Sequence, residues 1–220
     1  PPAAGPEVRV RVSFLNIYEL ALPQHTYTAR IFFEASWVDA SLTSADAAET
    51  APIDLWPRQC PFERNASRRW CPRLTLNNLF DTKDREEWYS VFTRSADGSE
   101  ELPAPVVAYR LKVIGTFTNR FLLHSFPFDS IPLSIDVISL LPRNAGCTMV
   151  PNSTPRYSSV ANTAAFNMDG EYRLDAPLAV VERYSDPKDS STGTVYKLVH
   201  FQAWLHRRPH FYLYNVYSPN

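Results

Sequence analysis

The chain has 220 residues, of which 45% are hydrophobic and 13% aromatic, with only six glycines but 19 prolines. Its formal net charge of -1 disfavours a nucleic-acid partner, because such proteins usually present an excess of Lys and Arg. It contains no GxGxxG or GxxxxGK motif, so no glycine-built phosphate loop is predicted. No run of about 18 apolar residues occurs, and the length suits one large β domain or two small ones.

The cysteines and two N-x-S/T sequons favour an extracellular compartment. The sequons begin at Asn65 and Asn152, and the first lies in a polar stretch between Cys60 and Cys71 that is typical of an exposed loop. We expect a Cys60–Cys71 disulfide to close this loop and Cys147 to be a free thiol. A bond to Cys147, or three thiols, are alternatives that the sequence leaves open. No Cys/His spacing suggests a metal site.

Alternating apolar and polar residues predict the first strands. Residues 8–17 and 26–38 show this period-2 pattern and should pair as a long antiparallel hairpin. Residues 40–69, rich in Ala, Ser, Pro and charge, are expected to run over the surface. Leu74 and Leu76 indicate another strand.

A second hairpin is predicted in the middle of the chain. Its first strand spans residues 88–94, and the Asp97-Gly98 pair is a strong signal for the turn. For the segment before it, residues 83–88, a helical turn is considered as an alternative. Residues 109–113 alternate again and give a strand with one apolar and one basic face.

The chain is expected to be organised around residues 117–137, FTNRFLLHSFPFDSIPLSIDV, whose second half has the pattern of a half-buried strand. Pro127, between Phe126 and Phe128, predicts a turn held by two buried aromatic rings. Asp129 follows directly. It is either a local cap on backbone N–H groups or one half of a long-range ion pair.

The last hairpin is predicted from residues 179–184 and 195–206. Strands separated by turns, without a long helical period, predict one all-β domain over residues 1–220: an antiparallel, immunoglobulin-like β-sandwich of about ten strands. The tail, HRRPHFYLYNVYSPN, becomes more apolar toward its end. It suggests the entrance of a membrane helix, and a C-terminal edge strand is the alternative.

Four motifs together carry a family resemblance: FPFD, Trp70-x-Pro72, Trp37-x-Asp39 and the apolar tail. Their order and spacing resemble the extracellular ligand-binding domain of the pentameric ligand-gated ion channels, the Cys-loop receptor superfamily. The resemblance implies a ring of five copies on the extracellular side of the plasma membrane. Each interface would bind a small ligand or protons, and the ring would open a transmembrane pore. No enzymatic activity and no cofactor are implied.

In this family the FPFD loop is normally closed by two cysteines with 13 residues between them. The matching positions here are Asn119 and Leu133, which keep that spacing (133 minus 119 minus 1) without the disulfide. This state resembles the prokaryotic members. The resemblance also implies that Asp129, Glu19 and Arg207 form the charged cluster that couples the sandwich to the pore.

The resemblance further implies a ligand site between two subunits. Its expected residues are Asn77, Leu140, Tyr184 and Tyr196 on the principal side, with Phe32 and Arg110 on the complementary side. Leu140 replaces the usual aromatic, which argues against acetylcholine-like recognition. Glu34, two residues beyond Phe32, is expected to disfavour amino-acid transmitters.

Three alternatives accompany this interpretation. The first is a soluble, secreted ligand-binding protein with the same fold and no pore, and the second is a carbohydrate-binding β-sandwich. The third concerns the stimulus rather than the fold: His25 and His124 lie in or beside the coupling loops, so protons could replace a ligand.

Overall fold

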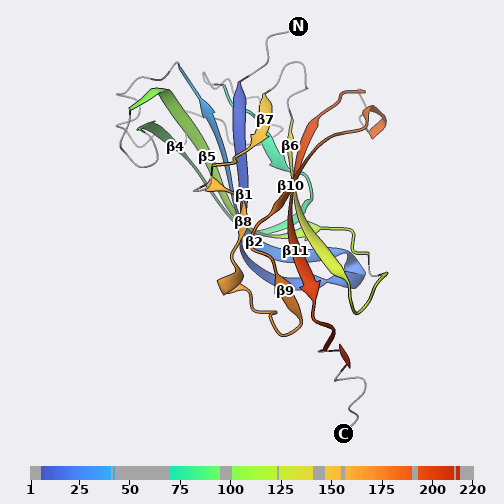
Figure 1. The fold of residues 1–220 in the computed structure, drawn as a ribbon. Helices are drawn as coiled ribbons and strands as arrows, with labels where there is room; N and C mark the ends of the chain where they lie inside the picture. The colour runs from blue at the N-terminus through green and yellow to red at the C-terminus, as the bar shows by residue number, and fades with distance from the viewer. Residues whose placement is uncertain are drawn as a thin grey trace.

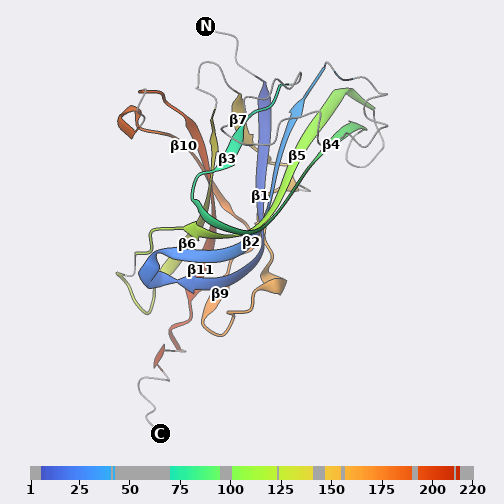
Figure 2. The same cartoon turned by 180° about the vertical axis from the view of Figure 1, so that it is seen from behind.

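The computed structural model describes residues 6–40, 42, 70–94, 101–122, 124–140, 147–154, 157–189, 193–210 and 212–213. These residues form two β-sheets that pack face to face (Figures 1 and 2). The short 3-10 helices η1 (Leu22–Gln24), η4 (Thr163–Ala165) and η5 (Pro187–Asp189) lie between strands. The prediction of an all-β two-sheet fold is confirmed.

The larger sheet has six strands in the order β4-β5-β2-β1-β7, with β8 also paired to β1. Strands β7 and β8 run parallel to β1, so the sheet is mixed rather than purely antiparallel as expected. The strands are β1 (Glu7–Ala21), β2 (Thr26–Val38), β4 (Leu79–Arg94), β5 (Glu101–Thr118), β7 (Thr148–Pro151) and β8 (Val160–Ala161).

The smaller sheet has five strands in the order β10-β11-β6-β3, with β9 also paired to β11, and every pair is antiparallel. Its strands are β3 (Leu74–Leu76), β6 (Ser130–Ser139), β9 (Tyr172–Leu174), β10 (Ala179–Tyr184) and β11 (Lys197–Arg207). Strand β6 is the second half of the stretch around which the chain was expected to be organised. It lies at the centre of this sheet, between β11 and β3.

The strand predictions agree with the structure for most of the described chain. Strand β2 has the predicted bounds, and β1 extends beyond residues 8–17 at both ends. The helical turn considered for residues 83–88 is wrong, because β5 pairs with this segment and makes it part of β4. Residues 43–69 and the Asp97-Gly98 turn lie outside the described residues.

The pairing of β1 with β2 is irregular in a way that matters for the site. The register shifts twice along β1, once shortly before and once directly after Ile17. With these bulges Arg11 stands opposite Glu34, which in turn stands opposite Arg110 of β5. Bulges therefore decide which charged side chains meet on the outer face of the six-stranded sheet.

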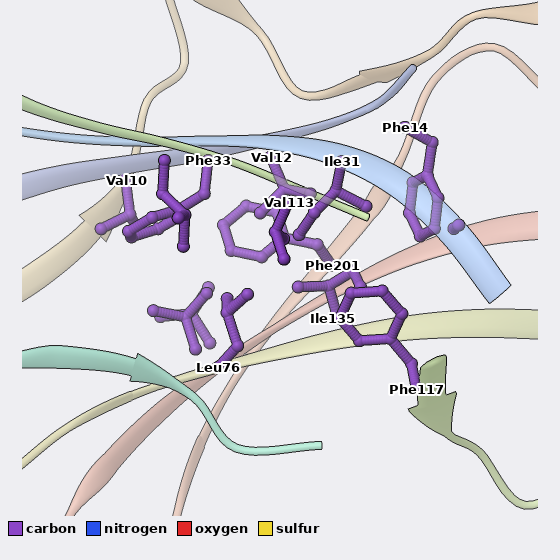
Figure 3. Close-up of a cluster of buried hydrophobic side chains, with 14 of the residues drawn as sticks. Val10, Val12, Phe14, Ile31, Phe33, Leu76, Val113, Phe117, Ile135 and Phe201 are labelled. Carbon is purple, nitrogen blue, oxygen red and sulfur yellow. The ribbon is translucent and has the colours of Figure 1, made fainter. Parts of the chain in front are cut away.

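The core lies between the sheets. In Figure 3, Val12, Ile31 and Val113 from the larger sheet face Ile135 and Phe201 from the smaller one. These side chains are at most 1% exposed. The alternation of buried and accessible positions along each strand explains why the pattern could be recognised in the sequence.

One end of the sandwich gathers three connections. Figures 1 and 2 place the β1–β2 connection, the β5–β6 connection and the C-terminal end of β11 together at the end opposite the N-terminus. Backbone N–H groups of Asn119 and Phe121 donate to the carbonyl oxygen and to Nδ1 of His25, at 2.8 and 3.3 Å. These bonds hold the first two connections to each other.

After β11, the described part of the tail is helical at residues 209–210 and 212–213, so it does not form the edge strand considered as an alternative. Within the described ranges, no helix combines the length and hydropathy needed to cross a membrane.

We predict that the fold is lost in alkaline solution. Burial, followed by the charge of Asp136, raises the pKa of Tyr27 well above 10.0, and burial raises the pKa of Tyr172 to about 12. A folded pKa above the unfolded value stabilises the fold below pH 10, and this stability is lost as the pH rises from 10 toward 12.

A titration of tyrosinate absorbance alongside circular dichroism tests this prediction. These tyrosines should ionise together with the loss of β structure. A Tyr27→Phe variant should lose stability less steeply over the same interval. Complete tyrosine ionisation with the β spectrum intact would contradict the prediction.

Candidate functional site

A buried ion pair joins the FPFD turn to the end of β11. Arg207 donates from Nε to Oδ1 of Asp129 at 2.6 Å and from Nη2 to Oδ2 at 3.2 Å. Both side chains are only 3% exposed, and the backbone N–H of Arg207 donates to the Asp129 carbonyl at 3.1 Å. Of the two roles considered for Asp129, the structure shows the long-range ion pair. A planar guanidinium matched to a carboxylate in this way is a strong and geometrically specific contact.

Aromatic rings surround the Arg207 guanidinium. Its Cζ lies 5.1, 4.9 and 5.0 Å from the ring centroids of Phe126, Tyr172 and Tyr212. Nη1 also donates to the Tyr212 hydroxyl at 2.5 Å, and this hydroxyl donates to Glu171 at 3.2 Å. Burial would lower the pKa of Arg207, but the hydrogen bond to Asp129 and neighbouring charges outweigh it and raise the pKa. The cation is therefore permanently charged.

The FPFD segment forms the predicted turn, but the expected burial of its two rings is wrong. Phe126 is 55% exposed and Phe128 is 69% exposed. Phe126 packs edge-on against Tyr212 with the ring centroids 5.1 Å apart. The turn lies at the end of the sandwich, outside the core, and is held by the Asp129–Arg207 pair rather than by buried aromatics.

Glu19 is the third expected member of the charged cluster, and none of the contacts described for the structured residues joins it to this pair. It is an exposed residue of β1 and pairs in register with Thr28. Among the described residues it makes no ion pair with Arg207. The second acid near Arg207 is Glu171, which is linked to it through Tyr212. Neither contact was expected from the sequence. The fold brings Glu171 near the end of β11, whereas Tyr212 lies five residues after Arg207 and reaches it because the tail turns back.

Three charged side chains form a row across the outer face of the six-stranded sheet: Arg11, Glu34 and Arg110. Oε1 of Glu34 lies 2.9 Å from Nε of Arg11, and Oε2 accepts a hydrogen bond from Nε of Arg110 at 2.6 Å. Glu34 is 5% exposed, so its carboxylate depends on both arginines for compensation. Glu34 was expected to disfavour amino-acid transmitters, and in the structure two arginines compensate its negative charge.

The rings near this row already contact cations. Cζ of Arg11 lies 5.3 Å from the Phe32 ring centroid and 4.9 Å from that of Tyr157. Cζ of Arg110 lies 5.1 Å from the Phe92 centroid. The faces that would attract an ammonium ligand are thus used by the protein's own guanidinium groups.

A cavity of about 270 Å³ opens beside the row, between β2, β4, β5 and the segment after β7. Charged side chains of Glu34, Arg94 and Arg110 line it, together with apolar side chains that include Phe92 and Leu102. Its volume is close to the lower end of the range for small-molecule sites, about 300 Å³. A ligand held here would contact both arginine and apolar surface.

The structure divides the expected ligand residues into two groups. Phe32 and Arg110 lie on the six-stranded sheet, on the face that carries the row. The others belong to the five-stranded sheet or its ends: Asn77 after β3, Leu140 after β6, Tyr184 at the end of β10 and Tyr196 before β11. None of the described contacts connects the two groups within one chain.

Arg11, Phe92 and Tyr157 were not expected from the sequence. Arg11 alternates with Val10 and Val12, which assigns it to the outer face of the sheet, but its pairing with Glu34 depends on the bulges. Nothing in the sequence around Phe92 or Tyr157 indicates that these rings would reach the same cavity.

The thiols and sequons can be placed only in part. Cys60 and Asn65 lie outside the described residues, so the disulfide and the first glycosylation site stay predictions. Cys71 is buried, with its Sγ 3.7 Å from the Tyr89 hydroxyl. Cys147 is a thiol 3.8 Å from the Ser139 hydroxyl, and burial raises its pKa. The second sequon residue, Asn152, lines the cavity.

In the described part of the chain, no cluster of three or more His, Cys, Asp or Glu side chains could hold a metal ion. On the outer face of the smaller sheet, Nδ1 of His200 lies 2.7 Å from Asp136 and Nε2 of His206 lies 2.8 Å from Asp175. Each imidazole is thus engaged by a single carboxylate.

No protein-family model matches the chain, and no curated protein matches it in sequence.

Proposed function

We propose that the chain is the extracellular ligand-binding domain of a homopentameric ligand-gated ion channel in the plasma membrane. The single observation that carries the proposal is the buried Asp129–Arg207 pair. It attaches the FPFD turn to Arg207, the last residue of β11, which lies at the start of the tail that the resemblance assigns to the pore entrance. Any movement of the turn would therefore be transmitted to the tail.

The surroundings of the pair suit a coupling role. Arg207 contacts Asp129 directly and reaches Glu171 through Tyr212, so two acids share one permanent cation. Such a cluster can redistribute its contacts between two states of similar energy. Exposed Phe126 and Phe128 at the same end offer apolar surface to a neighbouring layer, here the membrane domain.

The two groups of expected ligand residues support assembly. They lie on different sheets of one chain, so a site using both groups would form where the five-stranded sheet of one copy meets the six-stranded sheet of the next. A ligand at this interface changes the pore only if it binds the open and closed rings with different affinity.

Expression of the natural polypeptide that contains this chain tests the proposal. We expect pentamers in native mass spectrometry and a current evoked by a small ligand or by acid in electrophysiology. A polypeptide without apolar helices after Asn220, or one that stays monomeric and passes no current, would contradict the channel. The first result would favour the secreted binding protein.

The coupling role has its own test in Arg207→Lys. Lysine keeps the charge but cannot make the two-pronged contact with Asp129. We expect the agonist concentration for half-maximal current to rise about tenfold while direct binding changes little. Arg173→Lys is the matched control, because Arg173 is exposed and its Nε lies 3.6 Å from Asp175. Equal losses of binding and current for Arg207→Lys would exclude a coupling role.

A further inference from the structure

The charged row beside the cavity has a net positive charge. Arg11 and Arg110 contribute two positive charges against one negative charge on Glu34. Arg94 also lines the cavity, and its Nη2 lies 3.8 Å from Glu101, whose side chain is 84% exposed. The three side chains of the row are at most 24% exposed, so solvent screens their field less than at an open surface.

Arg110 has hydrogen-bonding capacity that its known partners do not use. Its Nε donates to Glu34 and its Nη1 donates to Ser90 at 3.4 Å. For Nη2, no acceptor is found in the part of the chain that the structure describes. Because Arg110 lines the cavity, a carboxylate bound there can accept from this group and gain a charge-assisted hydrogen bond.

A cationic ligand would find the opposite conditions. The rings of Phe32, Tyr157 and Phe92 already contact the guanidinium of Arg11 or Arg110, so an ammonium group bound to the same ring face would compete with that guanidinium. Its positive charge would also be repelled by Arg11 and Arg110, and solvent would screen this repulsion only partly because both side chains are mostly buried. Glu34 cannot compensate, since each of its oxygens contacts an arginine.

We propose that this cavity binds a small organic anion, with a carboxylate held by Arg110 and an apolar body packed against Phe92 and Leu102. The inference rests on the proposed function in one respect: it names the ligand class for the side of the interface that the six-stranded sheet supplies. The cavity itself belongs to a single chain, so binding can be measured without the pore.

Three probes of similar shape separate charge from size: phenylacetate, phenylacetamide and phenethylamine. Titrations of the 220-residue chain by calorimetry or NMR should show phenylacetate binding at least about tenfold more tightly than the other two, as one charge-assisted hydrogen bond predicts. Equal or tighter binding of the amine overturns the inference. So does the absence of binding by all three probes at their solubility limits.

Variants assign the contact to Arg110. Arg110→Gln should weaken phenylacetate binding about tenfold or more, whereas Glu34→Gln should retain or strengthen it because Arg110 remains and the net charge rises. Arg9→Gln is the matched control: Arg9 lies on the same strand as Arg11, is exposed and pairs with Glu7. The Arg9→Gln variant should bind phenylacetate like the unchanged chain. If its affinity falls as much as that of Arg110→Gln, the effect comes from overall charge, and the assignment to Arg110 is overturned.

If Arg110→Gln does not fold, a double variant with Glu34→Gln and Arg110→Gln replaces both partners and keeps the net charge. It should fold and lose the preference for phenylacetate, and retained preference would overturn the contact. Sizing of the natural polypeptide that contains this chain separates the two proposals. If that polypeptide binds phenylacetate but never forms rings, the anion site stands and the channel is contradicted. If it forms rings that prefer phenethylamine, the channel stands and the anion site is contradicted.

Discussion

Replacing Arg207 by alanine should destabilise the folded chain by about 3–5 kcal/mol. The reason is the environment of Asp129, which is 5% exposed and makes a two-pronged contact with Arg207. Without the guanidinium, a buried carboxylate would remain without its cation, and the rings of Phe126, Tyr172 and Tyr212 would lose the group that they surround.

Urea unfolding followed by circular dichroism measures this loss. A double variant with Asp129→Asn and Arg207→Gln should be more stable than Arg207→Ala, because it removes both charges and keeps hydrogen-bonding groups. Arg173→Ala breaks an exposed pair and should cost no more than about 1 kcal/mol. If Arg207→Ala costs as little as Arg173→Ala, the pair does not hold the turn.

The second large effect is expected for Asn78→Ala. Nδ2 of this buried side chain donates to the carbonyl oxygens of Thr118 and Ser134 at 3.0 and 2.7 Å, and Oδ1 accepts from the N–H of Asp136 at 3.0 Å. Thr118 ends β5 in one sheet, whereas Ser134 and Asp136 belong to β6 in the other. Alanine would remove a direct link between the sheets and take one hydrogen bond from each of these three backbone groups. The Ser134 carbonyl would still accept from the Tyr27 hydroxyl at 2.6 Å, so the main cost falls on the Thr118 carbonyl and the Asp136 N–H. At about 1–3 kcal/mol for each of these two groups, a loss of at least about 2 kcal/mol is expected.

The neighbouring asparagine provides the control. Asn77 is exposed and contributes a backbone N–H to the Asp136 carbonyl, which Asn77→Ala preserves. This variant should remain within about 0.5 kcal/mol of the unchanged chain. Thermal and urea unfolding of the two variants side by side compare identical substitutions at adjacent positions. Similar stabilities would show that the side-chain bonds of Asn78 contribute little.

Much of the strand content followed from the sequence, because burial on one face imposes a period of two. Strand β2 was predicted with its observed bounds, and β6 was found from the same signal. Strand β10 was predicted with its observed bounds as one strand of the last hairpin, without such a pattern. The pattern was insufficient at residues 83–88, whose extended form comes from pairing with β5. It also overstated the burial of Phe126 and Phe128, since an aromatic beside proline carries no information about distance from the core.

The charged groups were harder to predict, for geometric reasons. The Asp129–Arg207 contact was expected from the family resemblance, and no local pattern predicted it. For Arg11, the register next to the β1–β2 turn pairs Ala21 with Thr26, and extending it without bulges would place Arg11 opposite residue 36. Two bulges shift the strands by two residues and bring Glu34 there instead. Bulge positions depend on packing between the sheets, which a single sequence does not display.

The parallel pairing of β1 has a consequence for the synthesis of the chain. Strand β1 can form its hairpin with β2 early, but its other edge waits for β7: Glu7 pairs with Thr148, which lies 141 positions later (148 minus 7). Until then the nascent protein exposes an unpaired edge to other chains, and contacts of such long range fold slowly. Charged Glu7, Arg9 and Arg11 alternate along this part of β1, and such charges discourage edge-to-edge association while the ribosome completes the sheet.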